Sequence, residues 1–199
     1  MNKVTKLSVV VLLLALMMYS SNALQAQEIT LPDDGSTEPY HPGLVSFRVG
    51  IYFYNTGHYE RALQEFTITT DGLPNWGIGF AARGDTYAAL GEYELAIADY
   101  DRAISIFPDF VSALYTRGRA YHALGETERA AADYANAIGQ MPEYALPYWG
   151  LGDILLEQSD KVNALASYRQ YVALIGEAPD EQVLAQIERL EQIAVPNIL

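Results

Sequence analysis

Aromatic, glycine, alanine and proline positions recur along the chain at a spacing of 34 residues. The clearest copy has marked positions at Gly84, Tyr87, Gly91, Tyr93, Ala96, Tyr100, Ala103 and Pro108. Moving 34 residues forward returns Gly118, Tyr121, Gly125, Ala130, Tyr134, Ala137 and Pro142. Moving 34 residues back returns Gly50, Phe53, Gly57, Tyr59, Ala62, Phe66 and Pro74. A fixed period of this length predicts stacked helix–turn–helix repeats.

The period divides the chain into four units, each expected to hold two antiparallel helices. Their ranges are 43–76, 77–110, 111–144 and 145–178. Gly57, Gly91 and Gly125 fall at the turn between the two helices, where a left-handed backbone suits glycine. The fourth unit has Ser159 there instead, which predicts a looser turn.

Small and large side chains alternate in a way that predicts how the two helices of a unit pack. A mid-helix glycine costs about 1 kcal/mol, so its recurrence at Gly50, Gly84, Gly118 and Gly152 indicates close helix contact. We expect the alanines of the second helix to face these glycines: Ala62, Ala96, Ala130 and Ala164. We expect the large positions to form the core: Phe53, Tyr87, Tyr121, Leu155, Phe66, Tyr100, Tyr134 and Tyr168.

Prolines mark the end of each second helix, and the residue after each proline is expected to cap the next helix. These residues are Asn75, Asp109 and the weaker Glu143. Beyond the fourth unit, residues 179–199 are predicted to hold one capping helix and a tail. Its apolar stripe consists of Val183, Leu184, Ile187 and Leu190, and a repeat stack needs such an end to close its core.

The N-terminus predicts export. Lys3 and Lys6 precede an apolar run that is too short to span a bilayer as a helix, and small residues follow it. Residues 1–26 are therefore interpreted as a signal peptide, with cleavage after Ala23 or Ala26. Residues 27–42 are rich in proline and acid and predict a flexible linker. No membrane anchor is expected once the leader is removed.

Composition excludes several kinds of chemistry. The chain of 199 residues carries a formal net charge of −13, which disfavours nucleic acid and anionic lipid as partners. It has no cysteine, so disulfides, cysteine-based metal sites and a thiol nucleophile are excluded. The three histidines are isolated in sequence, and no glycine-rich phosphate loop or nucleophile elbow is present. No metal, cofactor or catalytic residue is predicted.

The repeat resembles the tetratricopeptide repeat (TPR) in its period and in the offsets from Gly84 to Pro108. The resemblance covers residue 43 to about residue 190. It implies an all-α, right-handed solenoid of antiparallel helix pairs, a concave groove lined by the first helix of each pair, and no catalysis. It also implies that the groove holds a peptide or helix of another protein.

Under that resemblance, a set of apolar, aromatic and charged side chains is assigned to the groove. The candidate partner-binding residues are Phe47, Arg48, Ile51, Tyr54, Asp85, Tyr115, Arg119, His122, Trp149, Asp153 and Leu156. Aromatic and arginine side chains are common among binding hot spots. The leading hypothesis is an exported adaptor that binds another protein of unknown identity.

Two alternatives remain at this point. The protein could be a structural scaffold that self-associates into a homo-oligomer through its ends or its exposed aromatics. It could also be a carbohydrate-active enzyme that uses Asp153 or Glu157 in an aromatic groove, although the sequence contains no recognisable acid–base pair.

Overall fold

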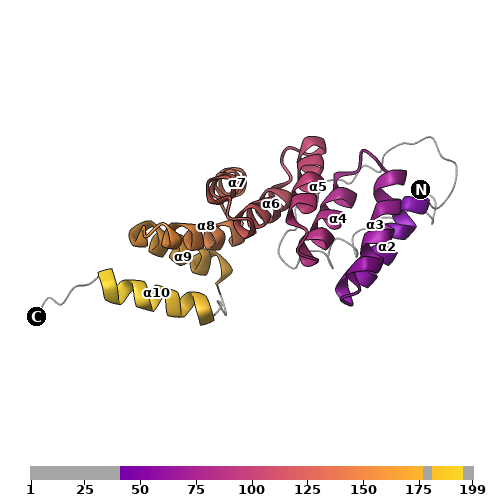
Figure 1. The fold of residues 1–199 in the computed structure, drawn as a ribbon. Helices are drawn as coiled ribbons and strands as arrows, with labels where there is room; N and C mark the ends of the chain where they lie inside the picture. The colour runs from indigo at the N-terminus through magenta and orange to yellow at the C-terminus, as the bar shows by residue number, and fades with distance from the viewer. Residues whose placement is uncertain (1–40, 177–180, 195–199) are drawn as a thin grey trace, which may run out of the picture. The chain divides into compact units, whose positions relative to one another are not determined.

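The computed structural model describes residues 41–176 and 181–194, and these residues form α-helices without any strand (Figure 1). The predicted signal peptide and most of the predicted linker lie outside the described residues. The all-α repeat architecture is confirmed. The chain divides into two compact units, Met1–Pro108 (unit 1) and Asp109–Leu199 (unit 2), which are described separately below.

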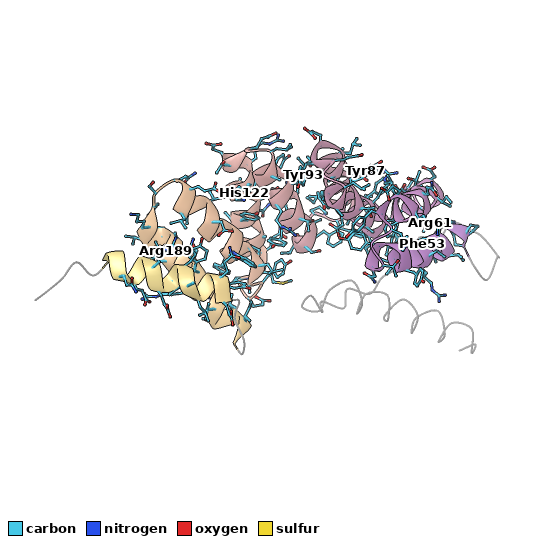
Figure 2. All side chains as sticks on the ribbon, turned by 60° about the horizontal axis from the view of Figure 1, so that its bottom comes forward. Phe53, Arg61, Tyr87, Tyr93, His122 and Arg189 are labelled. Atoms are coloured by element: carbon cyan, nitrogen blue, oxygen red, sulfur yellow. The ribbon has the colours of Figure 1, made fainter. Side chains whose placement is uncertain are left out.

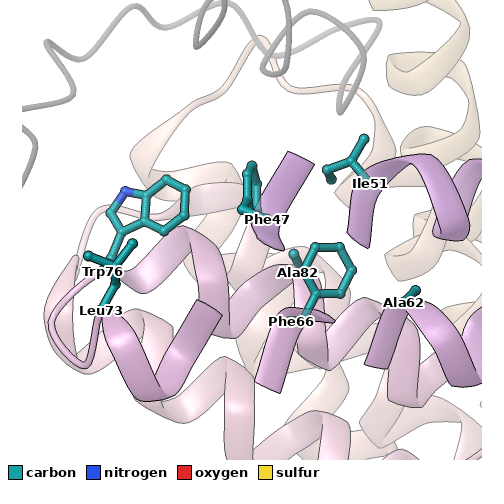
Figure 3. Close-up of a cluster of buried hydrophobic side chains, with 7 residues drawn as sticks. All are labelled: Phe47, Ile51, Ala62, Phe66, Leu73, Trp76 and Ala82. Atoms are coloured by element: carbon teal, nitrogen blue, oxygen red, sulfur yellow. The ribbon is translucent and has the colours of Figure 1, made fainter. Parts of the chain in front are cut away.

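Unit 1 consists of two helix pairs. Its helices are α2 (Pro42–Asn55), α3 (Tyr59–Gly72), α4 (Gly77–Ala89) and α5 (Tyr93–Ile106). Phe47 contacts both Phe66 and Trp76, with ring centroids 5.7 and 4.6 Å apart, and Ala82 of α4 joins the same buried cluster (Figure 3). This cluster joins the first helix pair to the second, as a stack of repeats requires.

Unit 2 consists of two helix pairs and one further helix. Its helices are α6 (Val111–Ala123), α7 (Thr127–Gln140), α8 (Leu146–Glu157), α9 (Lys161–Ile175) and α10 (Glu181–Ala194). Helix α10 lies at the residues where the sequence predicts a terminal helix. It packs on α9 through buried Val183 and Leu190, whereas Leu184 of the predicted stripe is exposed.

The tight turns inside the four pairs share one backbone conformation. Gly57, Gly91 and Gly125 have φ of 76, 81 and 76°. Ser159 has φ of 65°, so the fourth turn keeps the left-handed geometry without a glycine, and the expectation of a looser turn is not met. A side chain in this region carries a steric cost that glycine does not.

The mid-helix glycines make room for an aromatic ring of the second helix. A Cβ at Gly84 would lie 2.8 Å from the ring of Tyr100, and one at Gly118 would lie 2.7 Å from the ring of Tyr134. The nearest alanine atom is a carbonyl oxygen, 3.2 Å from the Gly84 position and belonging to Ala96. The expectation of glycine–alanine packing is therefore corrected: the recurring aromatic, rather than the alanine side chain, fills the space above each glycine.

An ion pair recurs at the same offset in both units, and it was not predicted from the sequence. Arg83 Nε lies 2.7 Å from Asp99 Oδ2, and Arg117 NH2 lies 2.6 Å from Asp133 Oδ1. Both aspartates are buried, and each arginine makes two hydrogen bonds to its partner. The bonds to Asp99 raise the pKa of Arg83. Each pair ties the first helix of a repeat to the second.

The predicted helix caps are wrong. The N-cap positions of α4, α6 and α8 are Trp76, Phe110 and Ala145, and none of these makes a side-chain capping hydrogen bond. The apolar Trp76 side chain instead packs in the core of unit 1. Packing between repeats, rather than polar capping, thus determines where these helices begin.

Among the described helices, none combines the length and apolar character that crossing a lipid bilayer requires.

Candidate functional site

The first helix of every repeat has one position that lies 15 residues before the recurring aromatic of the second helix. The four pairs, in chain order, are Ile51 with Phe66, Asp85 with Tyr100, Arg119 with Tyr134, and Asp153 with Tyr168. The first pair is apolar and lies in the core of unit 1. In the second and fourth, the tyrosine hydroxyl donates to the aspartate at 2.7 and 2.6 Å.

The third pair departs from this pattern. An arginine side chain cannot accept a hydrogen bond. Arg119 therefore cannot accept one from the Tyr134 hydroxyl, whereas Asp85 and Asp153 each accept one from a tyrosine. Arg119 is exposed, and its guanidinium carbon lies 5.9 Å from the ring centroid of Tyr115. Among the described residues, no carboxylate forms an ion pair with it.

Side chains from α6 and α8 form a mixed aromatic and charged surface in unit 2. We call it the α6–α8 surface and define it by Tyr115, Arg119, His122, Trp149, Asp153, Leu156 and Glu157. The Tyr115 ring lies 5.8 Å from Tyr134 and 5.7 Å from Tyr144, and Trp149 lies 5.4 Å from Tyr171. Tyr115, Trp149 and Leu156 are each partly exposed, so apolar area is open on this surface.

His122 bridges the two helices of this surface. Its Nε2 atom lies 3.0 and 3.1 Å from the two carboxylate oxygens of Glu157 (His122 is labelled in Figure 2). The sequence analysis assigned His122 to the groove and treated it as an isolated histidine. The ion-pair partner in the structure is Glu157.

Asp153 is held by its neighbours. Burial raises the pKa of Asp153, while hydrogen bonds from Tyr168 and Trp149 and the nearby His122 act in the opposite direction. These bonds fix the carboxylate against α9 and stabilise its ionised form. The arrangement gives Asp153 a role in packing, as it gives Asp85 in unit 1.

The predicted groove residues of unit 1 divide into core and surface. Phe47 and Ile51 are 5% and 6% exposed and pack in the core of unit 1, which corrects their assignment to an open groove. They are buried because apolar side chains of the first pair pack against α4. Arg48 is exposed, and Tyr54 is partly buried with its ring 5.5 Å from that of Tyr59.

Tyr144 and Tyr171 belong to the aromatic group around the α6–α8 surface, and the sequence reading did not include them. Tyr171 occupies the offset that holds alanine in the two preceding repeats, at Ala103 and Ala137. In the structure it is buried against Trp149. A tyrosine at an offset that holds alanine in the two preceding repeats was the signal that could have identified it.

Within the described residues, no group of three or more histidine, aspartate or glutamate side chains is arranged to hold a metal ion. Both carboxylates of the α6–α8 surface are engaged, Asp153 by Tyr168 and Glu157 by His122. What remains available for contact is one guanidinium and a group of aromatic and aliphatic side chains. Such a surface is suited to binding.

Comparison with known proteins identifies the repeats. Residues 84–125 and 118–159 match the family model described as TPR repeat. This stretch of the chain is therefore similar to the TPR repeat. A comparison with characterised protein sequences found no match.

Solved structures extend the likeness beyond that stretch. The MamA protein is 18% identical, with a TM-score of 0.67 over 76% of this chain and 82% of that chain. The first TPR of Spaghetti (RPAP3), bound to the HSP90 peptide SRMEEVD, is 24% identical, with a TM-score of 0.58 over 59% of this chain and 94% of that chain. The second TPR domain of human RPAP3, in complex with the HSP70 peptide SGPTIEEVD, is 25% identical, with a TM-score of 0.55 over 57% and 94%. The fold is thus that of TPR proteins.

Proposed function

We propose that this protein is an exported, non-catalytic adaptor that binds a segment of another protein on the α6–α8 surface. The observation that carries the proposal is the open aromatic area at Tyr115 and Trp149 within a stretch that matches the TPR repeat. Two of the structural neighbours are complexes with peptides, which supports a peptide segment as the ligand.

The absence of catalysis in this proposal rests on how the carboxylates are used. A general acid or base needs a proton path to its substrate. Asp153 accepts from Tyr168 at 2.6 Å, and Glu157 is paired with His122, so both serve contacts within the protein. A hydrolase that uses Asp153 is therefore disfavoured against the adaptor.

Export remains part of the proposal, and it depends on residues 1–26. The positive residues, apolar run and small residues of that segment support a leader, and the lack of cysteine agrees with a chain that needs no lipid attachment. Expression of the full chain in a bacterium, followed by mass spectrometry of the mature N-terminus, tests it. We expect cleavage after Ala23 or Ala26; an intact Met1 in the membrane fraction would contradict cleavage, and an intact Met1 in the cytoplasmic fraction would contradict export.

A pull-down from the native envelope fraction tests the adaptor function. The baits are the wild-type chain, Trp149→Ala and the control Tyr52→Ala, which removes an aromatic that is 65% exposed on α2. We expect one protein to be recovered by the wild type and the control and to be lost with Trp149→Ala. Circular dichroism confirms that each bait is folded, and Leu156→Gln is a second variant of the same surface. Equal recovery with every bait would contradict binding at the α6–α8 surface.

Self-association is the second candidate. Val45 and Tyr52 lie seven residues apart on one face of α2 and are 46% and 65% exposed. Such a face could contact another copy of the chain. Light scattering at micromolar concentration decides this: a monomer contradicts the scaffold, and recovery of nothing but the bait's own chain in the pull-down supports it.

A further inference from the structure

One cationic side chain of the α6–α8 surface, Arg119, has no ion-pair partner among the described residues, and this suggests what kind of segment the surface binds. Asp153 is engaged by Tyr168, Glu157 by His122, and Arg117 of the same helix by Asp133. Arg119 alone among these charged groups has no ion-pair partner in the described part of the chain. We infer that Arg119 is the anion-binding group of this surface and that the partner segment presents an acidic side chain beside an apolar or aromatic one. This inference rests on the proposed function.

The repeat pattern shows that Arg119 cannot have the hydrogen-bond acceptor role that Asp85 and Asp153 have at the same offset. In the other two polar pairs, the residue at this position accepts a hydrogen bond from the tyrosine of the second helix. Arginine cannot accept one, so Arg119 leaves the packing function of this position unfilled. It therefore needs a different physical explanation from Asp85 and Asp153, and an exposed guanidinium beside open aromatic area provides one.

Two aromatic rings prepare Arg119 for a carboxylate. The Tyr115 ring lies beneath the guanidinium, which restricts its motion and lowers the entropy lost on binding. The far end of the Tyr134 ring lies against α8 at Gly150, where a Cβ would come within 2.6 Å of it. The Tyr134 side chain is fully buried, which raises the pKa of its hydroxyl, so it remains neutral beneath this surface.

The apolar half of the segment has its own contact. Trp149 and Leu156 are partly exposed on α8, and Trp149 is supported from behind by Tyr171. A carboxylate on Arg119 and an apolar side chain on Trp149 therefore occupy neighbouring helices of one unit. The chain's net charge of −13 repels anions at long range, so this recognition operates at contact distance and is not a general affinity for anions.

Selection from a displayed peptide library tests the inference. The probe is a random 12-residue library fused ahead of a phage coat protein, so that no selected segment has a free carboxyl terminus. The baits are produced from the full coding sequence: wild type, Arg119→Ala, Arg119→Glu, Arg119→Lys and Arg189→Ala. Arg189 is the matched control because it is an exposed arginine of α10 in the same unit (Figure 2).

We expect acidic residues next to aromatic or aliphatic ones in the peptides selected by the wild type and by Arg189→Ala. The acidic preference should be lost with Arg119→Ala, kept in weaker form with Arg119→Lys, and replaced by Lys or Arg with Arg119→Glu. A selected acidic peptide, measured by fluorescence anisotropy, should bind Arg119→Ala at least about tenfold more weakly, since hydrogen bonds to charged groups are the strong ones.

Three outcomes would overturn the inference. Peptides that lack acidic residues but depend on Trp149 would leave the adaptor function standing and remove the role of Arg119. If Arg119→Ala selected acidic peptides as often as the wild type, the acidic side chain of the peptide would bind at a site other than Arg119. No selected peptide on a folded wild-type chain would contradict a linear acidic segment, while the envelope pull-down decides the adaptor function separately.

Discussion

In unit 1, Asp85 accepts a hydrogen bond from the hydroxyl of Tyr100. The equivalent pair in the preceding repeat, Ile51 and Phe66, is fully apolar. In unit 2, Asp153 likewise accepts a hydrogen bond from Tyr168, but Arg119 at the same offset cannot accept one from Tyr134, and its guanidinium lies over the Tyr115 ring instead. The packing of glycine against an aromatic ring is otherwise the same in both units. The comparison teaches that a residue at this offset can give up its hydrogen bond to the second helix while the backbone around it stays unchanged. A residue released in this way is a better candidate for function than one that merely lies on the concave side.

The ion pairs shared by the two units should give the largest effects. Replacing Asp99 with Ala, or Asp133 with Ala, leaves a largely buried guanidinium without its carboxylate. We expect each change to lower the free energy of unfolding by about 3 kcal/mol. Urea denaturation followed by circular dichroism measures it. A loss below about 1 kcal/mol in either unit would show that the pair is solvated and would break the equivalence of the two units.

Removing the tyrosine hydroxyls should distinguish the repeat that contains Arg119 from the two repeats that have an aspartate at the same offset. Tyr100→Phe and Tyr168→Phe each delete a hydrogen bond to a carboxylate and should cost about 2 kcal/mol of unfolding free energy. Tyr134→Phe deletes a hydroxyl without such a bond and should cost close to nothing. The three variants are matched, since each removes one oxygen at the same offset. Equal losses for all three would mean that the Tyr134 hydroxyl also forms a stabilising hydrogen bond, and would remove this contrast between the repeats.

Because the pKa of Asp153 is raised, the difference in stability between Asp153→Asn and the wild type should depend on pH. A carboxyl with a higher pKa in the folded state keeps its proton longer than in the unfolded chain, so its contribution to stability falls as pH rises from about 4 through the folded pKa. Asp153→Asn removes that loss while keeping an oxygen that can accept from Tyr168.

We therefore expect Asp153→Asn to gain stability relative to the wild type as the pH rises. The free energy of unfolding of the variant, minus that of the wild type, should be larger at pH 7 than at pH 4. Urea denaturation at both values measures the difference. A difference between variant and wild type that does not change with pH would contradict the buried setting of this carboxyl.

The turns should give the smallest effects. Ser159→Gly relieves a left-handed backbone with φ of 65° and should stabilise unit 2 by about 1 kcal/mol. The reverse change, Gly125→Ser in the same unit, should destabilise by a similar amount. Thermal unfolding compares the two. A loss of stability with Ser159→Gly would mean that the serine side chain contributes more than its backbone strain costs.

Much of the fold followed from spacing alone. The 34-residue period placed both helices of every repeat, and the glycines at the turns indicated the left-handed backbone, because each repeat forms similar local contacts. The terminal helix followed from an apolar stripe with a polar reverse side. These features depend on residues close together in the chain, and sequence patterns report such contacts well.

The division between core and surface depended on the tertiary structure. Phe47 and Ile51 occupy the same offsets as residues of the α6–α8 surface in unit 2, yet they are buried because α4 and Trp76 pack against them. The bonds of Asp85 and Asp153 to tyrosines, and of His122 to Glu157, join helices whose register no local pattern gives. The sequence by itself determined the repeat, its turns and its aromatic core, since those need only periodicity. Only the packing of helix against helix decided which charged side chains of the α6–α8 surface bond within the protein and which, like Arg119, do not.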